Sequence, residues 1–160
     1  MYRFREITEK DNPIIAKIIR DNLKAVGLDI PGTAYFDEGL DRFSELYEGK
    51  DKGYYVVERD DGEVIGGIGF SEFKLSISKD SAELQKLYLT DSAKGEGLGY
   101  KMVSFIEEKM REAGFKASYL ETHDSLGAAI HIYIKSGYTE IERPKEVGHS
   151  SMNRFFLKEL

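Results

Sequence analysis

Three glycines at every second position, Gly95, Gly97 and Gly99, mark the segment of this chain best suited to chemistry. An apolar run at 87–89 precedes them, and a stretch with helical spacing of apolar residues follows. Glycine lets backbone N–H groups approach a ligand, and a helix N-terminus favours an anion, so the arrangement suits a pyrophosphate. The alternative is that the glycines only permit a tight turn between a strand and a helix.

Two common phosphate-binding motifs do not fit this segment. A Walker loop requires Gly-Lys followed by Ser or Thr at the start of the helix, which is not present here. A dinucleotide fingerprint requires Gly-x-Gly-x-x-Gly beside an early strand, whereas the spacing here is Gly-x-Gly-x-Gly, late in the chain. The sequence therefore argues against both kinds of nucleotide site.

A known family has both this glycine segment and a second one downstream. Residues 94–99, Lys-Gly-Glu-Gly-Leu-Gly, resemble the Arg/Gln-x-x-Gly-x-Gly/Ala loop of the GNAT family of N-acetyltransferases. Residues 129–138 resemble that family's Ala-x-x-x-Tyr-x-Lys-x-Gly-Phe segment, with Tyr133 at the tyrosine. Lys94 departs from the usual Arg or Gln, which keeps the charge but loses the planar guanidinium.

The resemblance implies acetyl-coenzyme A as cosubstrate, bound where the fourth and fifth strands splay apart. Its pyrophosphate would bind the amides of residues 94–99, and its pantetheine arm would pair with residues 87–89 like an added strand. The amide of Leu89 would polarise the acetyl carbonyl. The implied cofactor-binding residues are Leu87, Tyr88, Leu89, Lys94, Gly95, Glu96, Gly97, Leu98, Gly99, Tyr100, Ser125 and Tyr133.

Two residues are candidate catalysts for the acetylation of an amine, which needs a base for the ammonium proton and an acid for the departing thiolate. The resemblance implies Glu83 as the base, but its usual pKa near 4.3 would have to be raised by burial or bridged by a water. A surface carboxylate on a strand is the alternative. The resemblance implies Tyr133 as the acid, although Tyr133 also fits an apolar helical stripe, where most aromatic residues are core.

The acceptor, an amine of a small molecule, an amino acid or a peptide, is not identified by the sequence. The resemblance places its groove between the first two helices and the late strands, so Tyr35, Phe36 and Tyr88 are expected to line it. His123 follows the fifth strand and could contact substrate or act as a base, with a solvated loop residue as the alternative. Leu126 stands where the family often has an asparagine that reaches pantetheine, and Ser125 or Asp124 could replace that contact.

One domain of 160 residues must position these groups. Hydrophobic periodicity predicts strands at 2–7, 54–58, 64–73, 83–89, 117–121, 138–142 and 151–157, and helices at 11–27, 37–47, 97–113 and 125–136. The fold class is therefore mixed α/β or α+β. The resemblance refines this to a mostly antiparallel sheet of six to seven strands with about four helices and parallel, splayed fourth and fifth strands.

Composition narrows the function further. The net charge of −6 argues against nucleic acid and anionic membrane surfaces as partners. With no cysteine and only three scattered histidines, including His131 and His149, we expect no metal site. No apolar run approaches the roughly 18 to 20 residues that span a bilayer, and we expect a cytoplasmic protein. The oligomeric state is open, although homodimers are common among proteins that resemble this one.

Two functions from different classes fit these residues. The first is an acetyl-coenzyme A-dependent N-acetyltransferase, which the intact Glu83 and Tyr133 favour. The second is a regulatory or degenerate module that binds coenzyme A without turnover. A purely structural domain is the third reading, and it would show no change in melting temperature with coenzyme A.

Overall fold

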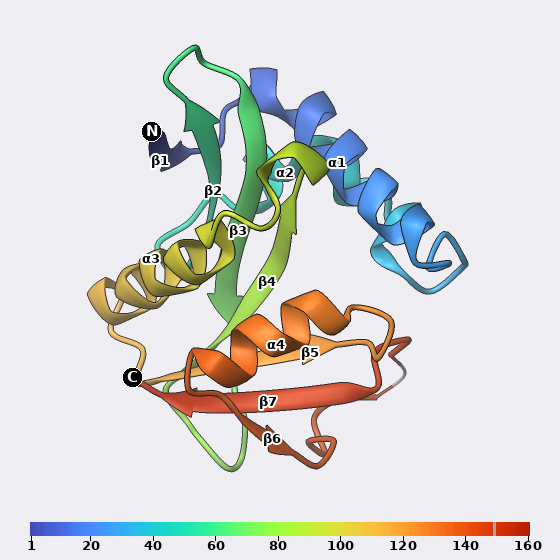
Figure 1. Ribbon diagram of the computed structural model, residues 1–160. Helices are drawn as coiled ribbons and strands as arrows, with labels where there is room; N and C mark the ends of the chain where they lie inside the picture. The colour runs from blue at the N-terminus through green and yellow to red at the C-terminus, as the bar shows by residue number, and fades with distance from the viewer. Residues whose placement is uncertain (149) are drawn as a thin grey trace.

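The computed structural model describes residues 1–148 and 150–160, which form one seven-stranded sheet with helices packed on both faces (Figure 1). The strand order is β1-β2-β3-β4-β5-β7-β6. Only β4 and β5 are parallel, and the other neighbours are antiparallel. The strands are β1 (Tyr2–Glu6), β2 (Lys52–Arg59), β3 (Val64–Glu72), β4 (Ser81–Leu89), β5 (Ala117–Thr122), β6 (Thr139–Ile141) and β7 (Arg154–Glu159). The predicted mixed sheet is confirmed.

Four α-helices accompany the sheet among the described residues: α1 (Asn12–Ala25), α2 (Phe43–Leu46), α3 (Leu98–Glu112) and α4 (Gly127–Lys135). Short 3₁₀ turns are η1 (Glu9–Asp11), η2 (Ala34–Phe36), η3 (Glu38–Arg42) and η4 (Asp91–Ala93). None of the helices in the described part of the chain has the length and apolar character needed to cross a membrane.

The second helix predicted at 37–47 is wrong over its first half. Residues Glu38–Arg42 form a 3₁₀ turn, and only Phe43–Leu46 are α-helical. The backbone of Arg42, at φ −143° and ψ 41°, leaves helical geometry and separates the two pieces. The last predicted strand also begins later, at Arg154, where pairing with β5 starts at Thr122.

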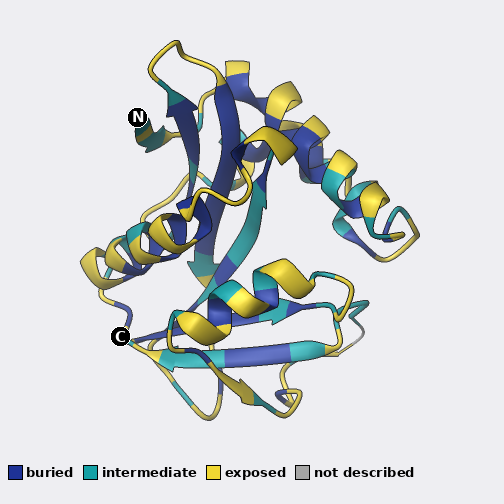
Figure 2. Ribbon diagram, in the orientation of Figure 1, coloured by how far each residue is buried: buried dark blue, intermediate teal, exposed yellow. Residues whose placement is uncertain are grey.

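Two apolar clusters join helices to opposite faces of the sheet. In Figure 2, α1 and α3 each have a buried side, drawn dark blue, and an exposed side, drawn yellow. One cluster joins α1 to the sheet through Ile15, Ile19 and Leu23, at helical spacing. The other joins α3 through Met102 and Ile106. Side chains alternate along a strand, so neighbouring residues of β2 serve different clusters, Val56 with α1 and Val57 with α3.

The parallel strands β4 and β5 pair only at their beginnings. Residues 81–83 pair with residues 117–119, and the strands then separate, β4 staying with β3 and β5 with β7. Among the described residues, no strand pairs with this edge of β4 from Leu84 onward. The predicted splay is confirmed, and it leaves backbone N–H and C=O groups open to a ligand.

A β-bulge interrupts β4 at Lys86, whose φ of 54° is positive. Lys86 is the one non-glycine residue in the described chain with positive φ. Tyr54 holds the bulge by donating its hydroxyl to Lys86 O at 2.8 Å. The Tyr54 ring lies over β3, where a Cβ at Gly67 or Gly69 would overlap it. These glycines therefore make room for the side chain that stabilises the bulge.

Candidate active site

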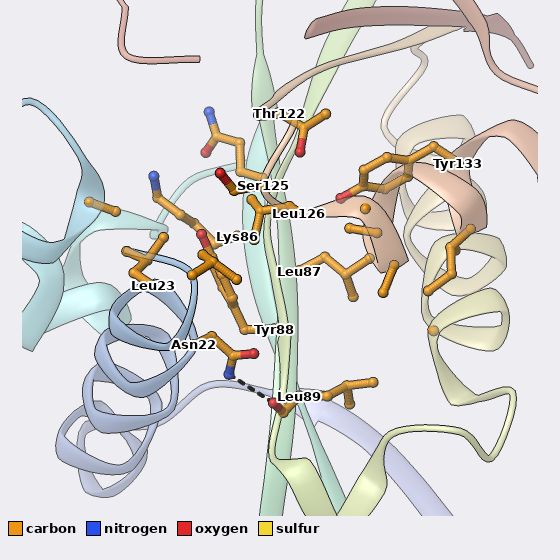
Figure 3. Close-up of a pocket in the computed structure, with 18 of the residues that line it drawn as sticks. Asn22, Leu23, Lys86, Leu87, Tyr88, Leu89, Thr122, Ser125, Leu126 and Tyr133 are labelled. Atoms are coloured by element: carbon orange, nitrogen blue, oxygen red, sulfur yellow. Dashed lines mark hydrogen bonds between the residues drawn. The ribbon is translucent and has the colours of Figure 1, made fainter. Parts of the chain in front are cut away.

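A cavity of about 810 Å³ opens where β4 and β5 diverge. Its walls are the open edge of β4, the glycine turn, the start of α4, the end of α1 and residues 150–152. Figure 3 shows its two sides: Leu87 and Tyr133 lie toward α4, whereas Lys86 and Tyr88 lie toward α1. The volume lies within the range typical of small-molecule and cofactor sites.

The glycines of the turn have two different roles. Gly95 and Gly97 have φ values of 83° and 75°, and a Cβ at either would meet no atom within 4 Å. They are glycines because the backbone is left-handed, and the space beside them is open. Gly99 instead packs α3 against α4, since a Cβ there would meet Ile132 Cδ1 at 2.5 Å. The amides at the N-terminus of α3 thus border the cavity and suit a diphosphate.

The two charged side chains of the turn, Lys94 and Glu96, bind different partners. Lys94 Nζ donates to Asn22 Oδ1 at 2.8 Å and to Asp91 Oδ1 at 3.0 Å. Glu96 accepts a hydrogen bond from the hydroxyl of Tyr2, and its side chain does not line the cavity. A role for Glu96 in binding therefore rests on its backbone amide alone.

Leu89 presents its backbone to the open edge of β4. Thr90 N–H donates to Ile65 O of β3 at 2.8 Å. Successive N–H groups of a strand point to opposite edges, so the N–H of Leu89 faces the cavity side. Its carbonyl accepts from Asn22 Nδ2 at 2.8 Å, the bond drawn in Figure 3.

Tyr133 is a core residue with a polar tip in the cavity. Its ring packs in the α3 cluster beside Tyr138 and Phe156, at centroid distances of 6.0 and 6.4 Å. The hydroxyl has no hydrogen-bond partner among the described residues and points toward the edge of β4 (Figure 3). Burial raises the pKa of Tyr133 above its usual value near 10, so the hydroxyl stays protonated at neutral pH.

Glu83 lies at the other end of the open edge, on the α1 side of β4. Gln85 Nε2 donates to Glu83 Oε1 at 2.6 Å, and Tyr47 donates its hydroxyl to Gln85 Oε1 at 2.6 Å. Burial, together with the negative charge of Glu121, raises the pKa of Glu83 to about 7. A carboxylate with this pKa meets the condition for a base at neutral pH.

Sequence reasoning missed two charged residues of the cavity, Glu121 and Lys86. Glu83 pairs with Tyr119 across the parallel strands, and Glu121 follows two residues later on the same face of β5. Tyr119 donates to Glu121 Oε2 at 3.1 Å, and Ser150 donates to Glu121 Oε1 at 3.2 Å. Period-two alternation from Tyr119 was the signal that could have identified Glu121.

Of the expected acceptor residues, Tyr88 lines the cavity, whereas Tyr35, Phe36 and His123 do not. Phe36 is 59% exposed, and Tyr35 packs against it at a centroid distance of 5.0 Å. The short turn η2 directs both side chains away, so Thr33, Ala34 and Asp37 line the cavity in their place. The ring of His123 is also outside, and its Nδ1 accepts from Ser125 N–H at 3.1 Å.

The start of α4 offers one polar replacement for the asparagine expected near pantetheine. Ser125 and Leu126 both line the cavity. Asp124 is held by Arg154 at 2.9 Å and does not line it, so Ser125 is the polar side chain in position. His149 lies outside the described residues. Within residues 1–148 and 150–160, no group of three or more His, Asp or Glu side chains could hold a metal ion.

Comparisons with known proteins agree with this geometry. The sequence model of the "Acetyltransferase (GNAT) family" matches residues 16–138. The uncharacterized N-acetyltransferase YjgM of Escherichia coli (strain K12) is 37% identical over 158 residues, 98% of this chain and 93% of that protein.

Solved structures share the fold at low identity. An acetyltransferase of the GNAT family from Staphylococcus aureus Mu50 superposes with a TM-score of 0.84 and 18% identity, over 99% of each chain. The PaiA N-acetyltransferase of Thermoplasma acidophilum, solved in complex with coenzyme A, gives a TM-score of 0.74 and 17% identity over 100% of this chain and 99% of that one.

Proposed function

The chain belongs to the acetyltransferase (GNAT) family, and from this premise we propose that it transfers the acetyl group of acetyl-coenzyme A to a primary amine of a small molecule, amino acid or peptide. The observation that carries the proposal is that the open edge of β4 brings Glu83, Tyr133 and the glycine turn to one cavity.

The donor half of the cavity fits acetyl-coenzyme A. The left-handed backbone at Gly95 and Gly97, with open space beside it, suits a diphosphate on the amides of residues 94–99. The unpaired edge of β4 at Leu87 and Leu89 suits the amide groups of pantetheine, which would pair as an added strand. Ser125 offers a hydroxyl to the same arm.

Glu83 and Tyr133 divide the proton chemistry between them. Glu83 takes the proton from the acceptor's ammonium, directly or through a water, and frees the nitrogen lone pair for attack on the thioester carbonyl. The N–H of Leu89 stabilises the negative charge that develops on the carbonyl oxygen. As the C–N bond forms and the C–S bond breaks, Tyr133 donates a hydrogen bond to the departing sulfur, and the second proton that the nitrogen loses reaches the thiolate through water, which gives the amide and the free thiol. Since thiols have a pKa near 8.5, well below that of buried Tyr133, the tyrosine keeps its proton.

Thiol release tests the proposal directly. Purified protein is incubated with acetyl-coenzyme A and a panel of amines, amino acids and peptides, and free thiol is measured. We expect release that depends on both substrates. Coenzyme A should also stabilise the fold, by about 2.7 kcal/mol at a hundredfold excess over its dissociation constant. Stabilisation without release for any amine would favour the coenzyme A-binding module, and neither effect would favour a structural domain.

Two finer expectations belong to the same proposal: a cytoplasmic location and a homodimer. The family membership is compatible with both. Sedimentation of the purified chain at several concentrations tests the dimer, and cell fractionation tests the location.

A further inference from the structure

The acceptor half of the cavity carries charges of both signs. Its acidic side chains are Glu83, Glu121 and Asp37, and its basic side chain is Lys86. All four line one cavity, yet no ion pair within 4 Å joins Lys86 to any of the three in the described chain. A pocket in which positive and negative side chains lie apart is suited to a ligand that carries both a positive and a negative charge.

Lys86 has no internal partner. Its ammonium makes no hydrogen bond and no ion pair among residues 1–148 and 150–160. It stands at the bulge, in a left-handed conformation that glycine or asparagine would adopt at lower cost. Strained residues of this kind cluster at functional sites. The bulge carries the side chain to the α1 side of β4, away from Tyr133 (Figure 3).

Tyr88 supplies a second free donor beside Lys86. Its hydroxyl also lacks a hydrogen-bond partner within the described residues. In Figure 3 the side chains of Tyr88 and Lys86 lie together on the α1 side of β4. An ammonium and a phenol hydroxyl without acceptors form a site for an anionic group, in which the positive charge of Lys86 offsets the negative charge of Asp37 that acts on Tyr88.

The carboxylates are less suited to a second ammonium. Both oxygens of Glu121 already accept hydrogen bonds, from Tyr119 and Ser150. Glu83 is needed for the amine that reacts. A diamine would therefore bring its second charge toward Lys86, which repels it, and toward Asp37 as the remaining carboxylate.

We propose that the acceptor is a zwitterion, a small primary amine that also carries a carboxylate or phosphonate, with Lys86 and Tyr88 binding the anionic group and Glu83 facing the amine. The inference rests on the proposed function, because the anion site selects among acceptors of the same reaction. Both anions share the chemistry that Lys86 recognises.

Matched amines test the selection. β-Alanine is compared with β-alaninamide, and 2-aminoethylphosphonate with propylamine and with 1,4-diaminobutane, by thiol release from acetyl-coenzyme A. We expect kcat/KM to favour the anionic member of each comparison by about 10- to 100-fold, the range for a charge-assisted hydrogen bond. Lys86→Gln should bring these ratios close to one, and Lys86→Arg should retain most of the preference. The KM for acetyl-coenzyme A should stay within about twofold in both variants.

Lys79→Gln is the charge-matched control, since Lys79 is exposed in a loop outside the cavity and its loss changes the net charge equally. A binding measurement adds a readout besides turnover: titration of 2-aminoethylphosphonate into protein saturated with coenzyme A, where Lys86→Gln should weaken binding at least about tenfold.

The outcomes separate the two proposals. Thiol release with neutral amines or diamines as the best acceptors, or a preference for anionic amines that Lys86→Gln leaves intact, overturns the zwitterion inference and leaves the acetyltransferase standing. No release with any amine overturns the proposed function, and the inference falls with it.

Discussion

Lys94 and Asn22 join the glycine turn to the end of α1, through a hydrogen bond of 2.8 Å between Lys94 Nζ and Asn22 Oδ1. The same Asn22 side chain donates to Leu89 O, on the edge of β4. One amide thus fixes the turn, the strand and the helix relative to one another. Lys94, which departs from the Arg or Gln of the family pattern, has a structural role at this junction.

Asn22→Leu should loosen this junction. The variant loses these two hydrogen bonds and the one that Asn22 Nδ2 donates to Ile18 O within α1. We therefore expect the KM for acetyl-coenzyme A to increase about 5- to 10-fold and the free energy of unfolding to fall by about 1 kcal/mol. Steady-state kinetics and urea unfolding measure the two effects. A fall in kcat with an unchanged KM would contradict a role of this junction in holding the coenzyme A-binding turn in place.

Glu83→Gln should change the pH dependence of turnover. In the wild type, kcat/KM should rise with pH through about 7, as Glu83 ionises, and then level off until the amine itself deprotonates. In the variant only the unprotonated amine reacts, so kcat/KM should rise about tenfold per pH unit toward the amine pKa, near 10.4 for a lysine-like amine. The deficit should be largest at and below pH 7 and should shrink above it, as more of the amine is unprotonated. Glu72→Gln, on the exposed end of β3, is the control. Parallel profiles for wild type and Glu83→Gln would exclude Glu83 as the base.

Glu83 should also affect the pH dependence of folding stability, in the direction opposite to that of a salt-bridged carboxylate. Burial raises the pKa of Glu83 from 4.5 to about 7, so the folded protein retains a proton that the unfolded chain has already released between these values. Stability therefore decreases as pH rises through this window. Glu83→Gln does not titrate, so it should gain stability relative to the wild type between pH 4.5 and 7 and keep that advantage above pH 7. Urea unfolding at several pH values measures the difference, and a constant difference would contradict the raised pKa.

Tyr133→Phe should lower kcat about 100-fold or more while leaving the KM for acetyl-coenzyme A nearly unchanged, because the hydroxyl acts on the departing sulfur. Tyr138→Phe is a matched control. It also removes a buried hydroxyl, which donates to Ser118 Oγ at 2.6 Å away from the cavity. The control should lose stability and keep its turnover. Equal kcat values for the two variants would show that the Tyr133 hydroxyl has no catalytic role and that Tyr133 serves only in the core.

Gly97→Ala separates backbone strain from ligand binding when it is compared with Gly62→Ala. Both glycines are left-handed, at φ 75° and 88°, and neither Cβ would meet an atom within 4 Å. Each substitution should cost about 1 kcal/mol of stability. Only Gly97→Ala should also weaken coenzyme A binding, because Gly62 lies in the β2–β3 hairpin. Calorimetric titration measures the affinity, and equal affinities would argue against a diphosphate on this turn.

Much of the fold follows from local patterns in the sequence. Hydrophobic periodicity predicted the strands, including those at 54–58 and 64–73, which the structure joins in a hairpin that Arg59 N–H closes on Glu63 O at 2.9 Å. The glycine turn and Tyr133 were identified through two spaced motifs. These signals involve residues close together in the chain, so they can be recognised in a single sequence.

The parts that the sequence did not predict depend on contacts between distant segments. The bulge at Lys86 requires the hydroxyl of Tyr54, 32 residues away. Glu121 belongs to the cavity because β5 pairs with β4 only over three residues before it diverges. The spacing of Leu84, Leu87 and Leu89 did contain a trace of the bulge, since apolar residues three apart do not fit an uninterrupted strand.

The bulge in β4 changes the parity of the strand halfway along it. Before Lys86, odd-numbered positions face α1, as Glu83 and Gln85 do; after it, the even-numbered Tyr88 faces that side, and Leu87 and Leu89 face α3 and α4. One continuous strand thereby presents side chains to both faces of the sheet, and on the proposed function these faces would serve the donor and the acceptor. Substitution of Tyr88 could therefore change the preferred acceptor without changing Leu87, the neighbouring residue proposed to contact coenzyme A.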